Sequence, residues 1–226
     1  MSFSLPLRTL LSATLITAAT CAAVPALGAP RPRPTAVLDI QKLRAVNAGR
    51  FPNRILTCDA LVVGGGLGGV AAAEALAELG VPVVLTEPTS LLGGQLTSQG
   101  VSCPDENSYI EKTPGVGTRR YRELREQLRA RYAAMPGIKP GRASNPGAGW
   151  VSRICAEPMV WNAVINDRIN RLKSAAGIRE VLLRHQLVEI SRFPHNGRYH
   201  YADFVDLDSG RITRVAAKYL LDATEM

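Results

Sequence analysis

The chain has 226 residues, of which 46% are hydrophobic and 20% are charged, and its formal net charge is +8. This composition excludes an intrinsically disordered protein, and the length suits one large domain or one domain with an insertion. No recognised nucleic-acid motif accompanies the basic residues. We therefore interpret the charge as a source of solubility or of mild attraction for anionic ligands, and we expect no nucleic-acid partner.

Residues 1–28 have the pattern of a signal peptide: a single Arg8, an apolar stretch over 10–24, and small residues before Gly28. We expect cleavage near Gly28 or Ala29, which makes the protein periplasmic or secreted, with no stable membrane span afterwards. An uncleaved segment would instead anchor the chain in a membrane, although the stretch is short and diluted by Thr and Ser. A lipoprotein attached at Cys21 fits less well, because residues 18–20 are a poor lead-in.

Residues 29–54 are expected to be a lead-in, rich in Pro, Arg and Asn, with a short helical pattern over 40–46. A βαβ unit follows. Residues 60–63 predict a buried strand, residues 68–79 a helix that Gly80 ends, and residues 81–87 a second buried strand.

The glycines Gly64, Gly66 and Gly69 lie between the first strand and the helix with G-x-G-x-x-G spacing. Gly64 allows a tight turn, Gly66 lets a pyrophosphate approach the backbone, and Gly69 lets the helix pack close to the strand. Glu87 ends the second strand, where its carboxylate can accept hydrogen bonds from ribose hydroxyls and disfavours a 2′-phosphate. This context predicts a dinucleotide site; the alternative is a purely structural glycine turn.

Further along, residues 93–117 and 135–150 predict loops, and residues 119–132 and 157–177 predict helices, the second ended by Gly177. The arginine-rich helix over 119–132 is expected to have a solvated charged face. Strands are expected over 181–190, 199–207, 211–216 and 218–224, with turns at 195–198 and 208–211.

A second glycine loop over residues 91–100 follows Glu87 closely and favours FAD over NAD. With "ICAEP" at 154–158 and "KYLLDATE" at 218–225, these segments resemble the bacterial FAD-dependent oxidoreductases of the glutathione-reductase-like fold, over about residues 58–226. The resemblance implies an α/β fold: a doubly wound parallel sheet forming an FAD-binding Rossmann domain, with a β-meander and a helical and loop insertion. It divides the chain into a first FAD-binding part (55–100), the insertion (101–177) and a β-rich return (178–226).

The resemblance also implies which residues contact FAD. The glycine loop would hold the pyrophosphate, Glu87 the ribose, and Gly94 and Gln95 the flavin side, with the last strand returning to the cofactor; the full set is Gly64, Gly65, Gly66, Leu67, Gly68, Gly69, Glu87, Gly94, Gln95, Ala223 and Thr224. Glu225 stands where related flavoproteins commonly have glycine.

The function predicted is that of an FAD-dependent oxidoreductase acting on an unidentified small molecule. Relatives continue beyond the position of Met226, so we expect the chain to be the N-terminal part of such an enzyme. The alternatives are an NAD-dependent dehydrogenase and a non-catalytic dinucleotide-binding remnant. The sequence identifies neither a catalytic residue nor a metal site, nor an oligomeric state.

The remaining candidates for chemistry have structural interpretations that we favour. Cys103 is expected to be a half-buried thiol rather than a redox or flavin-linked one, and His185 a packed side chain rather than a base. Cys58, Cys103 and Cys155 allow one disulfide and a spare thiol, but their spacing selects no pair.

Overall fold

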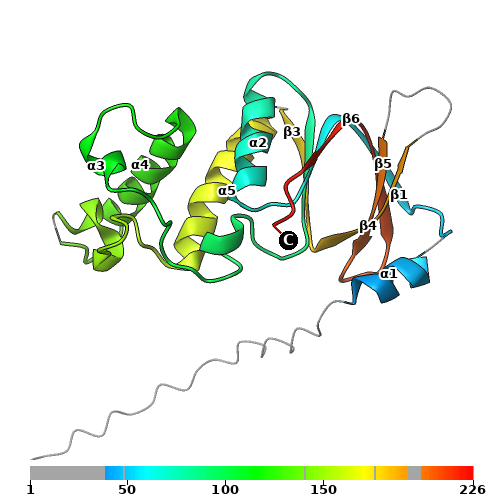
Figure 1. Cartoon of the computed structure of the whole chain (residues 1–226), viewed down its shortest axis with the longest axis horizontal. Coiled ribbons are helices and arrows are strands. Elements are labelled where there is room, and N and C mark those ends of the chain that lie inside the picture. The colour runs from blue at the N-terminus through cyan, green and yellow to red at the C-terminus, as the bar shows by residue number, and fades with distance from the viewer. Residues whose placement is uncertain (1–38, 48, 140, 176, 193–199, 226) are drawn as a thin grey trace, which may run out of the picture. The chain divides into compact units, whose positions relative to one another are not determined.

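The computed structural model describes residues 39–225 except 48, 140, 176 and 193–199 (Figure 1). The predicted signal peptide, residues 29–38 and 48 of the lead-in, and the turn at 195–198 lie outside these residues. Within the described part of the chain, no helix is both long enough and apolar enough to cross a membrane.

Six strands form one sheet in the order β3-β2-β1-β6-β5-β4. Three neighbouring pairs, β1 with β2, β1 with β6 and β2 with β3, are parallel; β4 with β5 and β5 with β6 are antiparallel. The strands are β1 (Arg54–Val63), β2 (Val83–Glu87), β3 (Ile178–Leu183), β4 (His185–Arg192), β5 (His200–Asp206) and β6 (Ile212–Asp222). The predicted α/β fold with a parallel sheet and a β-meander is confirmed.

The helices are α1 (Ile40–Asn47), α2 (Leu67–Glu78), α3 (Tyr109–Lys112), α4 (Arg119–Ala133) and α5 (Pro158–Ser174). Short 3-10 turns lie at Gly94–Leu96, Arg142–Ser144 and Pro146–Ala148. The predicted helices are therefore present. Helix α2 ends where Gly80 takes a φ of +76° and donates its N–H to the Ala77 carbonyl at 3.0 Å.

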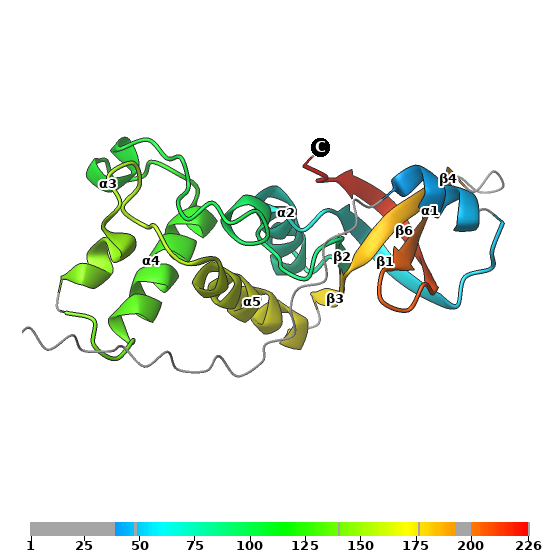
Figure 2. The same cartoon turned by 90° about the horizontal axis from the view of Figure 1, so that it is seen from below.

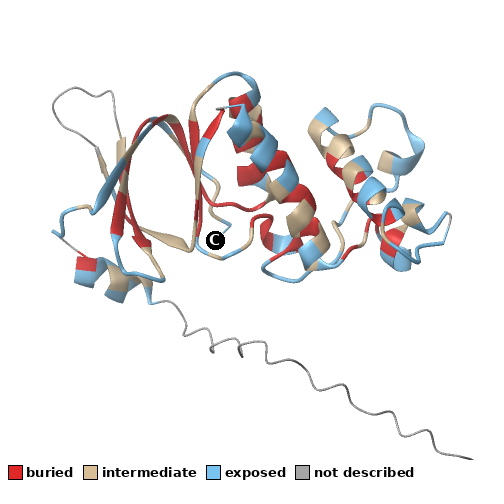
Figure 3. Cartoon of the chain, turned by 180° about the vertical axis from the view of Figure 1, so that it is seen from behind, coloured by how far each residue is buried: buried red, intermediate tan, exposed pale blue. Residues whose placement is uncertain are grey.

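The two faces of β1 are both buried, but against different partners. Ala60 and Val62 belong to the core that contains α2 and α5, whereas Leu61 and Val63 pack with Phe204 of β5. This alternation follows from the two-residue period of a strand. Helices thus cover one face of the parallel strands, and the curled meander covers the other; Figure 3 shows the buried residues concentrated between these layers.

Helix α5 lies beside α2 against the sheet, and α4 packs on α5 (Figure 2). A buried ion pair joins α2 to α5: the Arg168 guanidinium donates to both carboxylate oxygens of Glu74, at 2.6 and 2.7 Å. The segment 101–177 therefore supplies the crossover helix between β2 and β3 as well as inserted structure. Its boundaries remain a prediction.

The sequence misplaced two strand boundaries. Residues 181–190 form not one strand but the end of β3 and the start of β4, because Arg184 takes a φ of +59° between them. Residues 211–216 and 218–224 are mostly a single strand, β6, which pairs with β1 from Thr213 to Asp222. Since β3 and β4 lie at opposite edges of the sheet, the chain crosses from one edge to the other at Arg184, which requires a strongly curled sheet.

Helix α4 buries a stripe of Leu124, Leu128 and Tyr132, but its charged face is not wholly solvated, contrary to what the sequence had led us to expect. Arg125 is buried and forms ion pairs with Glu106 and Glu111 from the preceding segment. A buried guanidinium needs such partners, and they come from residues that sequence spacing could not place beside it.

Candidate cofactor site

The first glycine loop turns sharply between β1 and α2. Gly64 has a φ of +106°, a conformation that residues with a Cβ rarely adopt, and its N–H donates to the Thr86 carbonyl of β2 at 3.1 Å. A Cβ at this position would lie 2.3 Å from the Ala223 carbonyl oxygen, just beyond β6. Gly64 therefore lets the ends of β1 and β6 meet at the loop.

The start of α2 lies close to this turn. A Cβ on Gly69 would lie only 1.8 Å from the Gly64 carbonyl oxygen, so the contact is possible only for glycine. The first intrahelical bond runs from the Val70 N–H to the Gly66 carbonyl at 2.9 Å. The N–H groups of Leu67 and Gly68 precede it at the positive end of the helix dipole, an arrangement that suits an anion.

Glu87, at the end of β2, is buried beside the loop. One of its carboxylate oxygens accepts from the Gly65 N–H at 2.9 Å and the other from the Thr89 N–H at 2.8 Å. These two backbone donors hold the carboxylate in one orientation at the rim of a cavity between the loops and the sheet.

The second glycine loop lies directly against the first. The Gly93 N–H donates to the Gly65 carbonyl at 2.8 Å, and a Cβ on Gly94 would lie 3.0 Å from the Gly66 Cα. The Glu225 carboxylate sits between the two loops: Cβ atoms at Gly66 and Gly94 would lie 2.1 and 2.8 Å from its oxygens. The chain thus places a carboxylate of its own between the two glycine loops.

The cavity has a volume of about 270 Å³ and opens between the loops, the ends of the parallel strands and the meander. Typical ligand pockets measure about 300–1,000 Å³, so this space suits part of a dinucleotide rather than the whole. Six predicted site residues line it: Gly64, Gly66, Glu87, Gly94, Ala223 and Thr224.

The other predicted site residues lie elsewhere in the loops. Gly65 is covered by Glu87 and Leu92, Leu67 and Gly68 lie on the opening turn of α2, and Gly69 packs on the turn itself. Gln95 is exposed and does not line the cavity, where Ser98 and Gln99 stand instead. The cofactor contacts assigned to all of these residues remain predictions.

The far wall of the cavity was not predicted from the sequence. It consists of Ile40, His185, Gln186, Leu187 and Phe204, mostly from the meander. His185 is half-buried, and its Nδ1 lies 2.7 Å from the Leu183 carbonyl oxygen, which fits the expected packed role while leaving the residue at the cavity wall. The change of backbone direction at Arg184, between β3 and β4, brings these side chains to the glycine loops. No local sequence pattern predicts this change.

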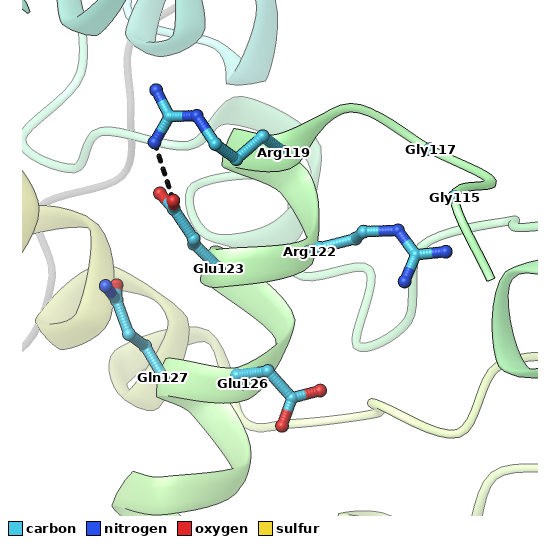
Figure 4. A pocket seen from close by; sticks show the side chains of 7 residues that line it. All are labelled: Gly115, Gly117, Arg119, Arg122, Glu123, Glu126 and Gln127. Carbon is cyan, nitrogen blue, oxygen red and sulfur yellow. Dashed lines mark hydrogen bonds and ion pairs between the residues drawn. The ribbon is translucent and has the colours of Figure 1, made fainter.

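A larger but shallow depression of about 580 Å³ lies along α4, beside Gly115 and Gly117 (Figure 4). Its side chains carry both signs of charge, and the Arg119–Glu123 ion pair at 2.6 Å crosses one turn of the helix. It includes no residue of either glycine loop. We interpret it as a solvated helix face, because exposed ion pairs of this spacing contribute little to stability.

The fold and the site together define a dinucleotide-binding α/β domain: a parallel sheet whose first strand runs through a glycine turn into a helix, with an acid ending the next strand. The sequence profile of the family described as FAD dependent oxidoreductase matches residues 59–226. The chain belongs to this family, as the sequence predicted, and FAD is the cofactor by which the family is described.

A search of curated proteins finds no match. Solved structures similar to the chain include L-proline dehydrogenase from P. horikoshii, with a TM-score of 0.40 and 16% identity over 76% of this chain and 23% of that one. A flavoprotein/dehydrogenase from Cytophaga hutchinsonii has a TM-score of 0.45 and 15% identity over 74% and 39%. The flavin-dependent monooxygenase PieE, solved with FAD and substrate, has a TM-score of 0.42 and 19% identity over 75% and 30%. The chain spans 23–39% of the lengths of these structures.

Proposed function

We propose that the protein is an FAD-dependent oxidoreductase, in which this chain supplies the part of the site that holds the ADP half of the cofactor. The observation that carries the proposal is the anion cradle formed by the two glycine loops and the start of α2. The Glu225 carboxylate already lies there, against the Gly66 and Gly94 backbones. A diphosphate is an anion that requires such close approach to the backbone and to the N–H groups of a helix start.

The residues present fit FAD at the other points that this chain covers. Glu87 is held at the cavity rim by the Gly65 and Thr89 N–H groups, where its oxygens can also accept from ribose hydroxyls. Its negative charge would repel a 2′-phosphate, so the site favours FAD or NAD over NADP. When bound, FAD supplies hydride or electron transfer with a substrate, and the protein supplies binding and orientation.

The chain's own residues then have separable tasks. The Gly66 backbone allows close approach, the Leu67 and Gly68 N–H groups lie where they can donate to phosphate oxygens, and Glu87 orients the ribose. Ser98 and Gln99, at the mouth of the cavity, offer further polar groups toward the flavin side. The substrate is proposed to be a small molecule.

We propose further that the protein is exported. The support is the order of features in residues 1–28: one basic residue, a short apolar stretch and a small-x-small site before Ala29. N-terminal sequencing of the mature protein tests this. A new N-terminus at residue 29 or 30 supports export, whereas an intact N-terminus would contradict cleavage and leave a membrane anchor as the alternative.

A matched pair of variants tests the cofactor site. The atoms nearest to a Cβ at Gly66 would belong to the flexible end of the Glu225 side chain, and a Cβ at Gly68 would meet no atom within 4 Å. Both variants should therefore fold. Gly66→Ala should weaken FAD binding by about tenfold or more, equivalent to about 1.4 kcal/mol, because it blocks the approach of the pyrophosphate. Gly68→Ala should bind more nearly like the parent.

Titration of each purified protein with FAD, followed by flavin fluorescence, gives the comparison, and NAD in parallel tests the alternative cofactor. Equal FAD affinity for the parent and Gly66→Ala would contradict the proposed cradle, and binding of NAD alone would favour a dehydrogenase. If FAD binds but no reductant in the assay reduces it, the non-catalytic remnant becomes the better account.

A further inference from the structure

Two segments far apart in the sequence meet beside the second glycine loop. The Ala156 N–H donates to the Ser102 carbonyl at 2.8 Å, which joins the peptide group between residues 155 and 156 to the one between residues 102 and 103. Cys103 and Cys155 are therefore attached to the two peptide groups that share this hydrogen bond. A disulfide needs Cα atoms about 4.4–6.8 Å apart, and paired backbones of this kind supply such closeness.

The contact is held in place from both sides. The indole N–H of Trp161, which is fully buried at the start of α5, donates to the same Ser102 carbonyl at 3.3 Å. On the other side, Gly149 makes room for the Cys155 side chain: a Cβ there would lie 2.2 Å from the Cys155 sulfur. These neighbours fix the backbone on both sides of the pair.

The Cys103 thiol lies close enough to Cys155 to help raise the pKa of the Cys155 thiol, and the Cys155 thiol donates to the Ser152 carbonyl at 3.3 Å. Both residues are half-buried, so a reagent can reach them. Cys58, in β1, is only 3% exposed, so its thiol is shielded from reagents. Among the cysteines that the structure describes, these two thus form a pair and Cys58 is the spare.

We infer that Cys103 and Cys155 are a disulfide site, closed by exchange with a small or protein disulfide in an oxidising compartment. The inference does not depend on FAD binding. The bond would join the segment that follows the second glycine loop to the segment that precedes α5. These two segments are 52 positions apart in the sequence (155 − 103). This selects one pairing from the three that the spacing left open.

The exchange balances without a further reagent. One protein thiolate attacks the external disulfide, which gives a mixed disulfide and releases one external thiolate. The second cysteine then attacks the sulfur of the first cysteine in that mixed disulfide, which forms the protein S–S bond and releases the other external thiolate. The external disulfide is reduced to two thiols, which take up the two protons, and one S–S bond forms in the protein. Burial and the neighbouring Cys103 thiol raise the pKa of Cys155.

Peptide mapping of the full chain tests the inference. The protein is equilibrated in a glutathione redox buffer, free thiols are trapped with iodoacetamide under denaturing conditions, and the peptides are mapped without reduction. We expect a linked pair of peptides containing Cys103 and Cys155 and an alkylated Cys58. Full alkylation of both cysteines, a glutathionyl group on each, or a bond to Cys21 or Cys58 would overturn the inference.

Variants give an independent readout. Cys103→Ser should leave Cys155 carrying one glutathionyl group, and Cys155→Ser should do the same at Cys103, whereas Cys58→Ser should retain the linked peptides. The Tm of the parent should fall by several degrees on reduction, while that of either single variant of the pair should not respond to reductant. A Tm that reductant leaves unchanged in the parent would contradict a closed bond.

Discussion

Replacing Gly69 by alanine should separate the start of α2 from the glycine turn. The added Cβ would lie 1.8 Å from the Gly64 carbonyl oxygen, 2.9 Å from its carbon and 3.3 Å from the Ala223 Cβ. Ordinary contact begins near 3.4 Å, so the helix start and the turn must move apart by about 1.6 Å (3.4 − 1.8). The Cβ is fixed by the backbone of α2, and the atom that it meets is a backbone oxygen, so no side chain can move aside to relieve the clash.

Overpacking of this kind costs about 1–3 kcal/mol. For a protein of this size, 1 kcal/mol corresponds to about 2–4 °C, so we expect the Tm to fall by about 2–12 °C. Gly68→Ala is the matched control, because it lies one position away in the same helix with no atom within 4 Å of the new Cβ. Alanine there should raise the free energy of unfolding by about 0.4–1 kcal/mol.

Scanning calorimetry of the parent and both variants without cofactor measures these shifts. If Gly69→Ala is as stable as Gly68→Ala, the close packing of α2 on the turn is not present in solution, and the reasoning about the loop is refuted.

Three further predictions concern buried and charged groups. Glu225→Gln should strengthen FAD binding about fivefold in a fluorescence titration, since removing a unit charge about 4 Å from a phosphate in water-like surroundings relieves about 1 kcal/mol; weaker binding would show that the carboxylate does not compete with the cofactor. Glu74→Gln should lower the free energy of unfolding in urea by about 3–5 kcal/mol, because the buried Arg168 guanidinium loses its bidentate partner and keeps the more distant Glu123 carboxylate, 3.9 Å away. The partly exposed Glu78→Gln should cost under about 1 kcal/mol, and equal losses would rule out this role for the buried pair. Burial raises the pKa of Cys58 from 9.0 to about 11. The buried thiol therefore stabilises the fold fully below pH 9, and this stabilisation is lost as the pH rises to 11. Over that range the free energy of unfolding of the parent should fall by roughly 2–3 kcal/mol more than that of Cys58→Ala, and parallel plots of this free energy against pH would contradict the burial.

The first half of the site was predictable because its signals are local. One helix and one strand of ordinary length lead from the glycine loop to Glu87, and Gly64, Gly69 and Glu87 each have a geometric task that only a few residue types perform. The structure places them as that spacing implies, with the Gly65 N–H bonded to the Glu87 carboxylate.

The second half depends on long-range pairing that periodicity does not encode. Residues 181–190 have one uninterrupted β pattern, yet Arg184 divides them between opposite edges of the sheet and carries His185 to the cavity wall. The approach of Cys103 to Cys155 likewise depends on contacts between two irregular segments, among them the hydrogen bond from the Ala156 N–H to the Ser102 carbonyl. Irregular segments have no period, so nothing in the sequence distinguishes their partners.

The most direct test of the central claim is the identity of the nucleotide that the purified protein carries. The ligand that heating releases is identified by mass spectrometry. Its amount is measured from the visible absorption of the flavin and compared with the amount of protein. We predict a yellow protein that releases FAD in a constant ratio to the amount of protein. A colourless protein that takes up no FAD, or one that retains NAD instead, would contradict it.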